Sequence, residues 1–310
     1  MMIISVYIPA TSANMGPGFD CMGIALDLWN ELHIELADDI QIDIEGFGED
    51  FLPRDETNLV VQCFRLLFDR CQRPFPGVHI KMVNRIPIAA GLGSSAAALV
   101  GGLLAANVLL DSPFTRAQIL RFAVEDEGHP DNVAPAFLGG AVLAYLHEDG
   151  VTHVNLPLRD NFTFVAVTPS FPLLTETARS VLPPLVKRED AIFNMAHAGF
   201  LTAALTTGNV ALLRKSLRDR LHQDARKSLI PAYDEVVAAA LGAGAIGTVL
   251  SGAGPTLLSI VEGGPSSNHV AKAMVDAFAA NEIVANAHVL APASIGAYTH
   301  VRMKGVHHHG

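Results

Sequence analysis

The chain has 310 residues, half of them hydrophobic and only 17% charged, a composition typical of a compact globular protein rather than a disordered one. Its formal net charge of −10, with no block of Lys or Arg, argues against nonspecific binding to nucleic acid. The three cysteines form no CxxC pair, which favours reduced thiols in a cytoplasmic protein over a disulfide or metal site. No basic segment followed by a long apolar run opens the chain, so we expect no signal peptide.

A membrane span must be weighed at residues 86–110, which contain no charged residue. The stretch opens with Pro87 and the turn-forming run GLGSS, which leaves too short a helix to cross a bilayer. The sequence therefore favours a helix that is buried on all sides in a soluble core, and we expect no membrane partner.

In chain order, the first half of the sequence predicts strands by their alternating apolar residues and helices by their caps and apolar spacing. The expected elements are strands at 3–10, 32–38, 40–46 and 78–84, a helix capped by Thr57 that runs to about Arg70, the buried helix after the GLGSS loop, a helix at 115–125, and a loop, helix and strand within 127–145.

The pattern changes near residue 155. The second half predicts a strand at 162–169, helices at 191–206, 210–221 and 233–241, two strands joined by a Gly-rich turn at 248–261, a helix at 267–280 and a strand at 283–290. This β-β-α-β ending is typical of a ferredoxin-like half. We therefore expect domains at 1–155 and 156–304, with 296–301 a candidate to return to the first domain, and a tail at 305–310. The three histidines of the tail are interpreted as a terminal remnant rather than a metal site.

The strongest local motif is PIAAGLGSSAA at 87–97. Gly91 and Gly93 allow turns and a close approach of the backbone to a ligand. Ser94 and Ser95 fall where the apolar helix begins, and a helix N-terminus offers free N–H groups and a partial positive charge to a phosphate. The GK[ST] ending of a Walker A loop is absent. A plain Gly-Ser turn that caps the helix is the alternative.

Two weaker motifs accompany it. PATSANMGPGFD at 9–20 places Asn14 and Asp20 in a tight loop after a strand, and SGAGPT at 251–256 places small residues between two apolar strands. Small residues there could hold the backbone against a neighbouring phosphate loop. Taken alone, each motif is explained as well by an ordinary turn.

Together, in this order and at these separations, the three motifs resemble the GHMP kinases over nearly the whole chain. The finer resemblance is to the homoserine kinase family, which has a PxTSANxGxGFD loop, a PxxxGLGSSAA loop and an HPDNVAP segment, found here at 129–135 with Glu127 ahead of it. The resemblance implies an α/β (α+β) fold with an N-terminal S5-domain-2-like domain that binds ATP and a C-terminal ferredoxin-like domain. It also implies a cytoplasmic kinase that phosphorylates the hydroxyl of L-homoserine with ATP in threonine biosynthesis.

The resemblance places the nucleotide and the metal as follows. Mg²⁺ would lie between Ser95 and Glu127, since it prefers hard oxygen ligands. Asn58 would line the adenine and ribose side, although a Thr-capped surface helix explains it equally well. ATP would lie on the loop and first helical turn formed by Pro87, Ile88, Ala89, Ala90, Gly91, Leu92, Gly93, Ser94, Ser95, Ala96 and Ala97.

The substrate residues are carried over in the same way, because homoserine bears an ammonium, a carboxylate and a hydroxyl. Asp20, with Asn14 beside it, would take the ammonium. Arg179 and Arg226 would take the carboxylate, although a surface ion pair is the commoner role for an isolated arginine. Thr175 lies in the segment of Arg179 and is assigned to the substrate as well.

Asn132, His129 and Arg179 are the expected catalytic residues. Asp131 and Asn132 stand side by side where some relatives in the superfamily use a catalytic aspartate. The resemblance implies that Asn132 faces the substrate and that the hydroxyl proton passes to the γ-phosphate, which a loose transition state permits. Asp131 is then structural.

Two other readings stay open. The chain could be another GHMP kinase that acts on mevalonate, a sugar or an isoprenoid precursor, or a non-catalytic ATP- or metabolite-binding protein, because fold does not fix function. The arginine pair and the first loop favour an amino-acid substrate, and Ser95, Glu127 and Asn132 together argue against a binding protein without activity. A homodimer is left open.

Overall fold

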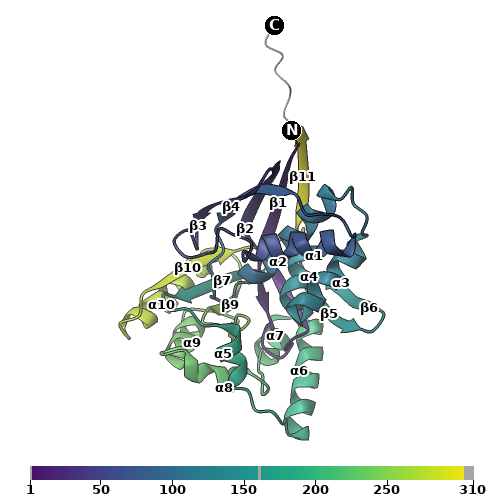
Figure 1. The fold of residues 1–310 in the computed structure, drawn as a ribbon. Helices are drawn as coiled ribbons and strands as arrows, with labels where there is room; N and C mark the ends of the chain where they lie inside the picture. The colour runs from purple at the N-terminus through teal and green to yellow at the C-terminus, as the bar shows by residue number, and fades with distance from the viewer. Residues whose placement is uncertain (1, 160–161, 304–310) are drawn as a thin grey trace.

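The structure, a computed structural model, describes residues 2–159 and 162–303, so the predicted tail at 305–310 lies outside the described residues. Two β-sheets form the framework, and helices cover them (Figure 1). The first sheet has the strand order β11-β1-β2-β4-β3, with β5 and β6 branching from β2. Its strands are β1 (Met2–Ala13), β2 (Met22–Ala37), β3 (Ile40–Gly46), β4 (Gly77–Asn84), β5 (Ala141–His147), β6 (Gly150–Leu156) and β11 (Tyr298–Met303).

The long strand β2 serves two parts of this sheet. Its register with β1 shifts between Pro9 and Ala10, which is a bulge that bends the pair. The two ends of β2, on either side of the bulge, have different partners: the first end pairs with β5 and the second with β4. Beyond the bulge, β1 stays paired with β2 as far as Ala13, past Thr11, where the sequence predicts a turn. The polar residues of the first motif therefore begin on a strand.

Four helices cover one face of the first sheet (Figure 1). They are α1 (Leu59–Arg70), α2 (Ser94–Leu109), α3 (Arg116–Glu127) and α4 (Pro130–Leu138). Most of α2 is buried, because it packs against both α1 and β1. The apolar stretch is thus a core helix, as predicted. Within the described residues, no helix combines the length and the apolar character that crossing a bilayer requires.

The second sheet has the order β10-β7-β9-β8, and all its pairs are antiparallel. Its strands are β7 (Phe162–Pro169), β8 (Gly247–Leu250), β9 (Leu257–Glu262) and β10 (Ala285–Leu290). In order along the chain these are strands 4-1-3-2 of a ferredoxin-like arrangement, which confirms the ferredoxin-like half. The last strand, β11, pairs with β1 and so joins the first sheet, although the predicted range 156–304 assigns it to the second domain.

The second half contributes the remaining helices. They are α5 (Thr175–Ser180), α6 (Arg188–Thr207), α7 (Val210–Ser216), α8 (Gln223–Arg226), a 3₁₀ turn (Lys227–Leu229), α9 (Tyr233–Gly242) and α10 (Ser266–Ala279). Alternation along β7 divides the core: Phe164 and Ala166 join the core of the first sheet, whereas Val165 and Val167 join a smaller core beneath α9 and α10. The larger core therefore extends across both halves, and the smaller core belongs to the second half alone.

Two predicted helix boundaries are wrong, each because a side chain binds the backbone. The helix expected at 210–221 ends at Ser216, because Asp219 accepts backbone N–H groups and draws the chain out of the helix. The cap expected at Thr57 is Asn58, whose side chain accepts from Val60 N at 3.0 Å. The Thr57 hydroxyl bonds to Asp55 instead.

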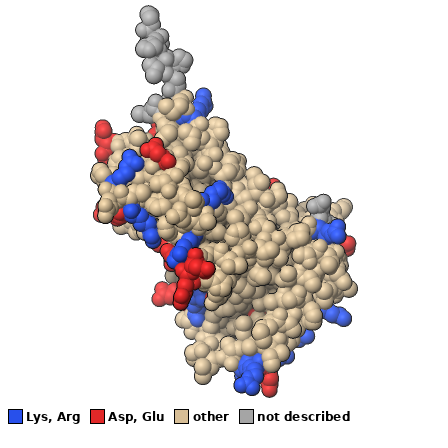
Figure 2. Space-filling view, turned by 90° about the vertical axis from the view of Figure 1, so that its right-hand side faces the viewer, with Lys and Arg blue, Asp and Glu red and all other residues tan. Residues whose placement is uncertain are grey.

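Charged side chains are dispersed over the face drawn in Figure 2, where Lys and Arg lie beside Asp and Glu. For the described part of the chain, this face shows no continuous basic surface of the kind that tracks a nucleic-acid backbone.

Candidate active site

The three motifs meet around one cavity of about 420 Å³. It is formed by the loop after β1, the loop and first turn of α2, the α3–α4 junction, α5 and the β8–β9 turn. The predicted site residues that line it are Asn14, Asp20, Asn58, Ile88, Ala89, Ala90, Gly91, Gly93, Ser94, Ser95, Ala96, Ala97, Glu127, His129, Asn132, Thr175, Arg179 and Arg226. Pro87 and Leu92 are predicted residues that are buried behind its wall.

The loop before α2 depends on two glycines with left-handed backbone angles, Gly91 at φ 80° and Gly93 at φ 71°. A Cβ on Gly93 would overlap Thr11 Oγ1, and one on Gly91 would overlap the carbonyl of Ser251. Glycine is required at both positions by angle and by space. The loop is therefore pressed against the other two motifs.

The start of α2 is suited to an anion. Gly93 is the N-cap residue, no side chain in the described chain caps the helix, and its first turn contains no acidic residue. The first-turn N–H groups of a helix lack intrahelical partners and carry partial positive charge. The residues of this turn, Ser94 to Ala97, line the cavity. The helix end can thus receive a phosphate, as the sequence predicts.

The SGAGPT turn supports this loop, which agrees with its predicted role. Ser251 Oγ donates to Gly91 O at 2.6 Å and lies 2.8 Å from Ser12 Oγ. Thr256 N donates to Ala90 O. The three motifs, far apart in sequence, are joined by these bonds into one wall of the cavity.

Asn132 is held by a residue that sequence reasoning missed. Thr11 Oγ1, fully buried, donates to Asn132 Oδ1 at 2.8 Å. With its oxygen engaged, the Asn132 amide has its N–H₂ group as the donor for a ligand in the cavity. The signal was present in the sequence, since Thr11 lies inside the TSAN motif.

His129 and Asp131 form a pair beside Asn132, with Nδ1 and Oδ1 2.5 Å apart. Burial lowers the pKa of His129, but the hydrogen bond and charge of Asp131 outweigh it, so the pKa is raised. The imidazolium form is therefore more populated than in an isolated histidine at the same pH. Asp131 is buried and engaged with His129, which supports its structural assignment.

Glu127 ends α3 at the cavity, and none of the described residues donates a hydrogen bond to its carboxylate. Burial raises its pKa, with the charge of Asp131 adding to this and that of His129 opposing it. An unpaired, partly buried carboxylate is stabilised by a cation. Asp20, His129 and Asp131 also bring possible metal-ligand atoms within 4.8 Å of one another. Both carboxylates of this group already have partners, because Arg179 pairs with Asp20 and His129 with Asp131.

Arg179 and Arg226 reach the cavity from the second half. Arg179 forms a two-pronged ion pair with Asp20, at 2.6 and 3.1 Å. Arg226 is 2% exposed and bonds backbone carbonyls of Ala178 and Gly252. No carboxylate of the described chain pairs with it. Burial and the charge of Arg179 lower the pKa of Arg226. A bound anion would offset both effects, so the Arg226 guanidinium is suited to bind one.

Asn14, Asn58 and Thr175 differ in how far their side chains are committed. Asn14 Nδ2 donates to Gly252 O and its Oδ1 accepts from Asp20 N, both at 3.0 Å, so Asn14 braces Asp20. Asn58 is buried as the cap of α1 and also donates to Pro53 O, at the cavity edge. Thr175 is exposed at the first turn of α5.

Similarity to known proteins decides the family. The model of the GHMP kinases N terminal domain matches residues 58–140, and that of the GHMP kinases C terminal matches residues 201–280. A homoserine kinase of Desulfitobacterium hafniense is 44% identical over 95% of this chain and 99% of its own length. The chain belongs to the homoserine kinases of the GHMP kinase family. A second relative of that name, from Microchaete diplosiphon, is 44% identical over 95% of this chain and 96% of its own.

Solved structures agree with the family. The homoserine kinase of Cytophaga hutchinsonii has a TM-score of 0.86 at 32% identity and covers 96% of this chain and 97% of its own. Mevalonate kinase of L. major, crystallised with R-mevalonate, has a TM-score of 0.70 at 14% identity, covers 93% and 95%, and shares the fold alone. The predicted two-domain GHMP kinase fold is thus confirmed, and membership of the family makes ATP the expected phosphoryl donor.

Proposed function

We propose that the chain transfers the γ-phosphoryl group of ATP to the side-chain hydroxyl of L-homoserine and so produces O-phospho-L-homoserine for threonine biosynthesis in the cytoplasm. One observation carries the substrate assignment. Arg226 is buried at the cavity without a carboxylate partner among the described residues, and Asp20 lines the same cavity as a carboxylate that can accept an ammonium. An amino acid offers a carboxylate to Arg226 and an ammonium that can replace Arg179 at Asp20, whereas mevalonate brings only a carboxylate and a neutral sugar brings neither charge.

Another set of residues that line the cavity suits the nucleotide. The first turn of α2 would take phosphate oxygens, and Asn58 lies on the side assigned to adenine and ribose. The domain division near residue 155 remains our proposal, with the nucleotide bound mainly by the first domain. The substrate then lies between the two halves, a common place for a small-molecule site.

The residues present fit Mg²⁺. Ser95 offers a hydroxyl and Glu127 a carboxylate, both at the cavity, and Mg²⁺ commonly takes only one or two protein oxygens beside phosphate and water. Glu127 lacks a hydrogen-bond donor among the described residues, so a cation would relieve its buried charge. When bound, the metal neutralises charge on the transferring phosphoryl group.

The side chains near the hydroxyl stabilise charge rather than remove a proton. Asn132, its oxygen held by Thr11, donates through its amide N–H₂, and His129, whose protonated form Asp131 stabilises, donates as well. Asp131 is committed to His129 and is not free as a base. As the homoserine oxygen bonds to the γ-phosphorus, the bond from that phosphorus to the β,γ-bridging oxygen breaks and ADP leaves. The hydroxyl proton passes to a γ-phosphate oxygen, and donors aimed at the phosphoryl oxygens supply the stabilisation.

The decisive experiment is ADP release measured by a coupled assay with L-homoserine, mevalonate and galactose as acceptors. We expect turnover with L-homoserine to exceed that with either other alcohol by at least tenfold. A preference for mevalonate or galactose would reassign the substrate within the family, and no release of ADP with any acceptor would point to a binding protein.

A further inference from the structure

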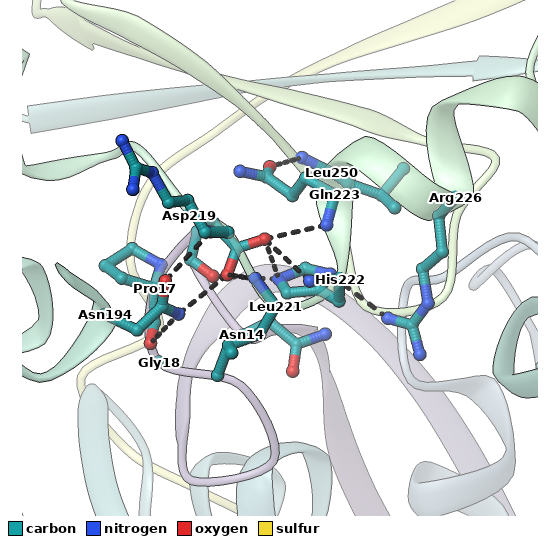
Figure 3. Close-up of polar contacts among 12 residues, drawn as sticks. Asn14, Pro17, Gly18, Asn194, Asp219, Leu221, His222, Gln223, Arg226 and Leu250 are labelled. Carbon is teal, nitrogen blue, oxygen red and sulfur yellow. Dashed lines mark hydrogen bonds and ion pairs between the residues drawn. The ribbon is translucent and has the colours of Figure 1, made fainter. Parts of the chain in front are cut away.

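His222 lies behind the substrate site, where two of its walls meet. It comes immediately before α8 and is 1% exposed. Its Nε2 donates to Gly16 O at 2.8 Å, in the loop that leads to Asp20. Its Nδ1 lies 3.3 Å from Arg226 Nη1 (Figure 3). One imidazole thus contacts both the segment of the proposed ammonium partner and the proposed carboxylate partner.

The two contacts fix the protonation state of this ring. A carbonyl oxygen only accepts, so Nε2 must carry a hydrogen, and a guanidinium only donates, so Nδ1 must be an unprotonated acceptor. Burial lowers the pKa of His222, which agrees with a neutral ring, although the charge of Asp219 opposes the shift. The ring is therefore a neutral Nε2–H tautomer.

A buried network holds the backbone of His222 in place (Figure 3). Asp219 accepts from the backbone N–H groups of Leu221, His222 and Gln223 at 2.7 to 3.0 Å. Asn194, on α6, donates to both Asp219 Oδ1 and Pro17 O. Burial raises the pKa of Asp219, whereas the hydrogen bonds that it accepts from Gln223 N, Asn194 and His222 N lower it and favour the ionised carboxylate. The network therefore connects α6, the segment before α8 and the first loop.

The consequence for Arg226 is a fixed guanidinium. Its Nε donates to Ala178 O, and its Nη1 donates to Gly252 O and faces His222 Nδ1. For Nη2 the described residues supply no partner, which leaves it for a ligand in the cavity. Phe19, next to Asp20, stacks on the His222 ring at 5.1 Å, and the Arg226 guanidinium lies 5.3 Å from the same phenyl ring.

We propose that His222 is a positioning residue for the substrate: its Nδ1 orients Arg226 toward the carboxylate, and its Nε2–H holds the loop that presents Asp20 to the ammonium. The proposal rests on the proposed function, because it assumes an amino-acid substrate. It goes beyond that function because it names a residue outside the cavity, His222, that sets the positions of the groups that bind the two charged ends of the substrate.

Two substitutions separate the two contacts. In His222→Asn the amide can reach the position of Nδ1 and accept from Arg226, but it is too short for Gly16. In His222→Gln the longer side chain can donate to Gly16 O, but it leaves Arg226 without its acceptor. We expect each variant to raise KM for L-homoserine about tenfold, with KM for ATP and kcat at saturating substrate changed less than twofold.

Two truncated substrates then assign each loss to one end. 3-Aminopropan-1-ol lacks the carboxylate and cannot use Arg226. His222→Gln should therefore change KM for this alcohol little, whereas His222→Asn should still raise it. 4-Hydroxybutanoate lacks the ammonium, so the order should reverse. Losses that are equal for both truncated substrates, or that fall on kcat instead of KM, would overturn the positioning role.

A matched control is His197→Gln. His197 is only partly buried, but like His222 it stacks on a phenylalanine, Phe193, and it does not line the cavity or contact a site residue. We expect wild-type kinetics from it. If the His222 variants fail to fold by circular dichroism, ¹⁵N NMR of the wild type decides, because the proposal requires an unprotonated Nδ1 and a protonated Nε2. An imidazolium or the opposite tautomer at neutral pH would refute it.

The results also distinguish a failure of the His222 proposal from a failure of the proposed homoserine kinase activity. Wild-type activity on L-homoserine with an unchanged KM in both variants refutes the positioning role alone. Wild-type preference for another alcohol refutes the substrate assignment, and with it the reason for the two-ended effect, whatever the NMR result.

Discussion

Asp20 and Arg179 bind each other across the candidate active site, with Arg179 Nη2 2.6 Å from Asp20 Oδ1 and Nη1 3.1 Å from Oδ2. Asp20 follows β1, whereas Arg179 lies on α5, 159 residues later. The hydrogen bond and charge of Asp20 raise the pKa of Arg179. The two groups proposed for opposite ends of the substrate thus satisfy each other without it. A bound zwitterion must replace this pair, its ammonium taking Asp20 and its carboxylate taking Arg179.

Substitution of either partner should therefore impair the use of L-homoserine and leave the binding of ATP unchanged. Asp20→Asn and Arg179→Leu each remove a charge-assisted bond to homoserine, worth about 1.5–3 kcal/mol, so kcat/KM for L-homoserine should fall about tenfold to a hundredfold. Steady-state kinetics and ATP binding by calorimetry test this. ATP affinity should stay within about twofold, because neither residue belongs to the loop before α2.

The double variant distinguishes substrate binding from a purely internal role. If Asp20 and Arg179 serve only each other, removing both should be no worse than removing one. If each holds its own end of the substrate, the double variant should lose more than either single variant, and this is the result we expect.

Thr11 should affect turnover through Asn132. Thr11→Val removes the hydroxyl that fixes Asn132 Oδ1, so the amide is free to turn its donor away from the reacting oxygen. A hydrogen bond of this kind contributes about 1 kcal/mol, so we expect kcat to fall about fivefold, with KM for ATP unchanged. Thr11→Ser keeps the hydroxyl and should retain most of the rate. Equal rates for the Val and Ser variants would contradict the assignment.

The parts of the site that could be predicted from sequence are those carried by contiguous motifs. The GLGSS turn at the start of a buried helix follows from Gly91, Gly93 and the apolar run, because left-handed angles and close approach need glycine. The ferredoxin-like half follows from the β-β-α-β pattern. Both are local signals that the tertiary structure preserves.

The parts that could not be predicted depend on contacts between distant segments. The Thr11–Asn132 bond spans 121 residues, and the His222–Gly16 bond spans 206. The sequence near His222 suggests only a continuing helix, and the helix stops at Ser216 because Asp219 competes for the backbone. A histidine four residues before Arg226 was the available hint, since residues at that spacing share a helix face.

The His129–Asp131 pair should make stability depend on pH. The pKa of His129 in the folded chain is raised above its ordinary value of 6.5, so the pair stabilises the fold fully below about pH 6.5 and less as the pH rises through the folded pKa. Asp131→Asn should therefore lower the melting temperature more at about pH 6 than at about pH 9. NMR titration of His129 should show a lower pKa in the variant.

An exposed pair provides the comparison. His79 Nε2 and Asp43 Oδ2 are 2.7 Å apart, but 40% and 68% of their side-chain surfaces are exposed. Surface pairs contribute little, so Asp43→Asn should change the melting temperature only slightly at either pH. A pH dependence as large as that of Asp131→Asn would show that burial is not the cause.

Metal use should depend on Ser95 and Glu127. Ser95→Ala and Glu127→Gln each remove one proposed oxygen ligand with little change in shape, and we expect the apparent affinity for Mg²⁺ to fall about 10–100-fold, the range found when groups that support a metal site are lost. Binding of L-homoserine should change far less. Activity titrated against Mg²⁺, together with homoserine binding by calorimetry, separates the two effects.

The pH dependence of this metal affinity identifies Glu127 as a ligand. Protons and Mg²⁺ compete for the carboxylate, and burial raises the pKa of Glu127, so apparent Mg²⁺ affinity should begin to fall at a higher pH than for an ordinary glutamate. The amide of Glu127→Gln does not titrate in this range, so no proton competes with Mg²⁺ there. The weaker Mg²⁺ affinity of this variant should therefore not fall with the titration of residue 127. Asp126, one residue earlier, is exposed and does not line the cavity, but its charge also raises the pKa of Glu127; Asp126→Asn should therefore shift the wild-type profile slightly to lower pH and keep its slope. A Glu127→Gln profile with the same slope as the wild type would place the metal on other residues.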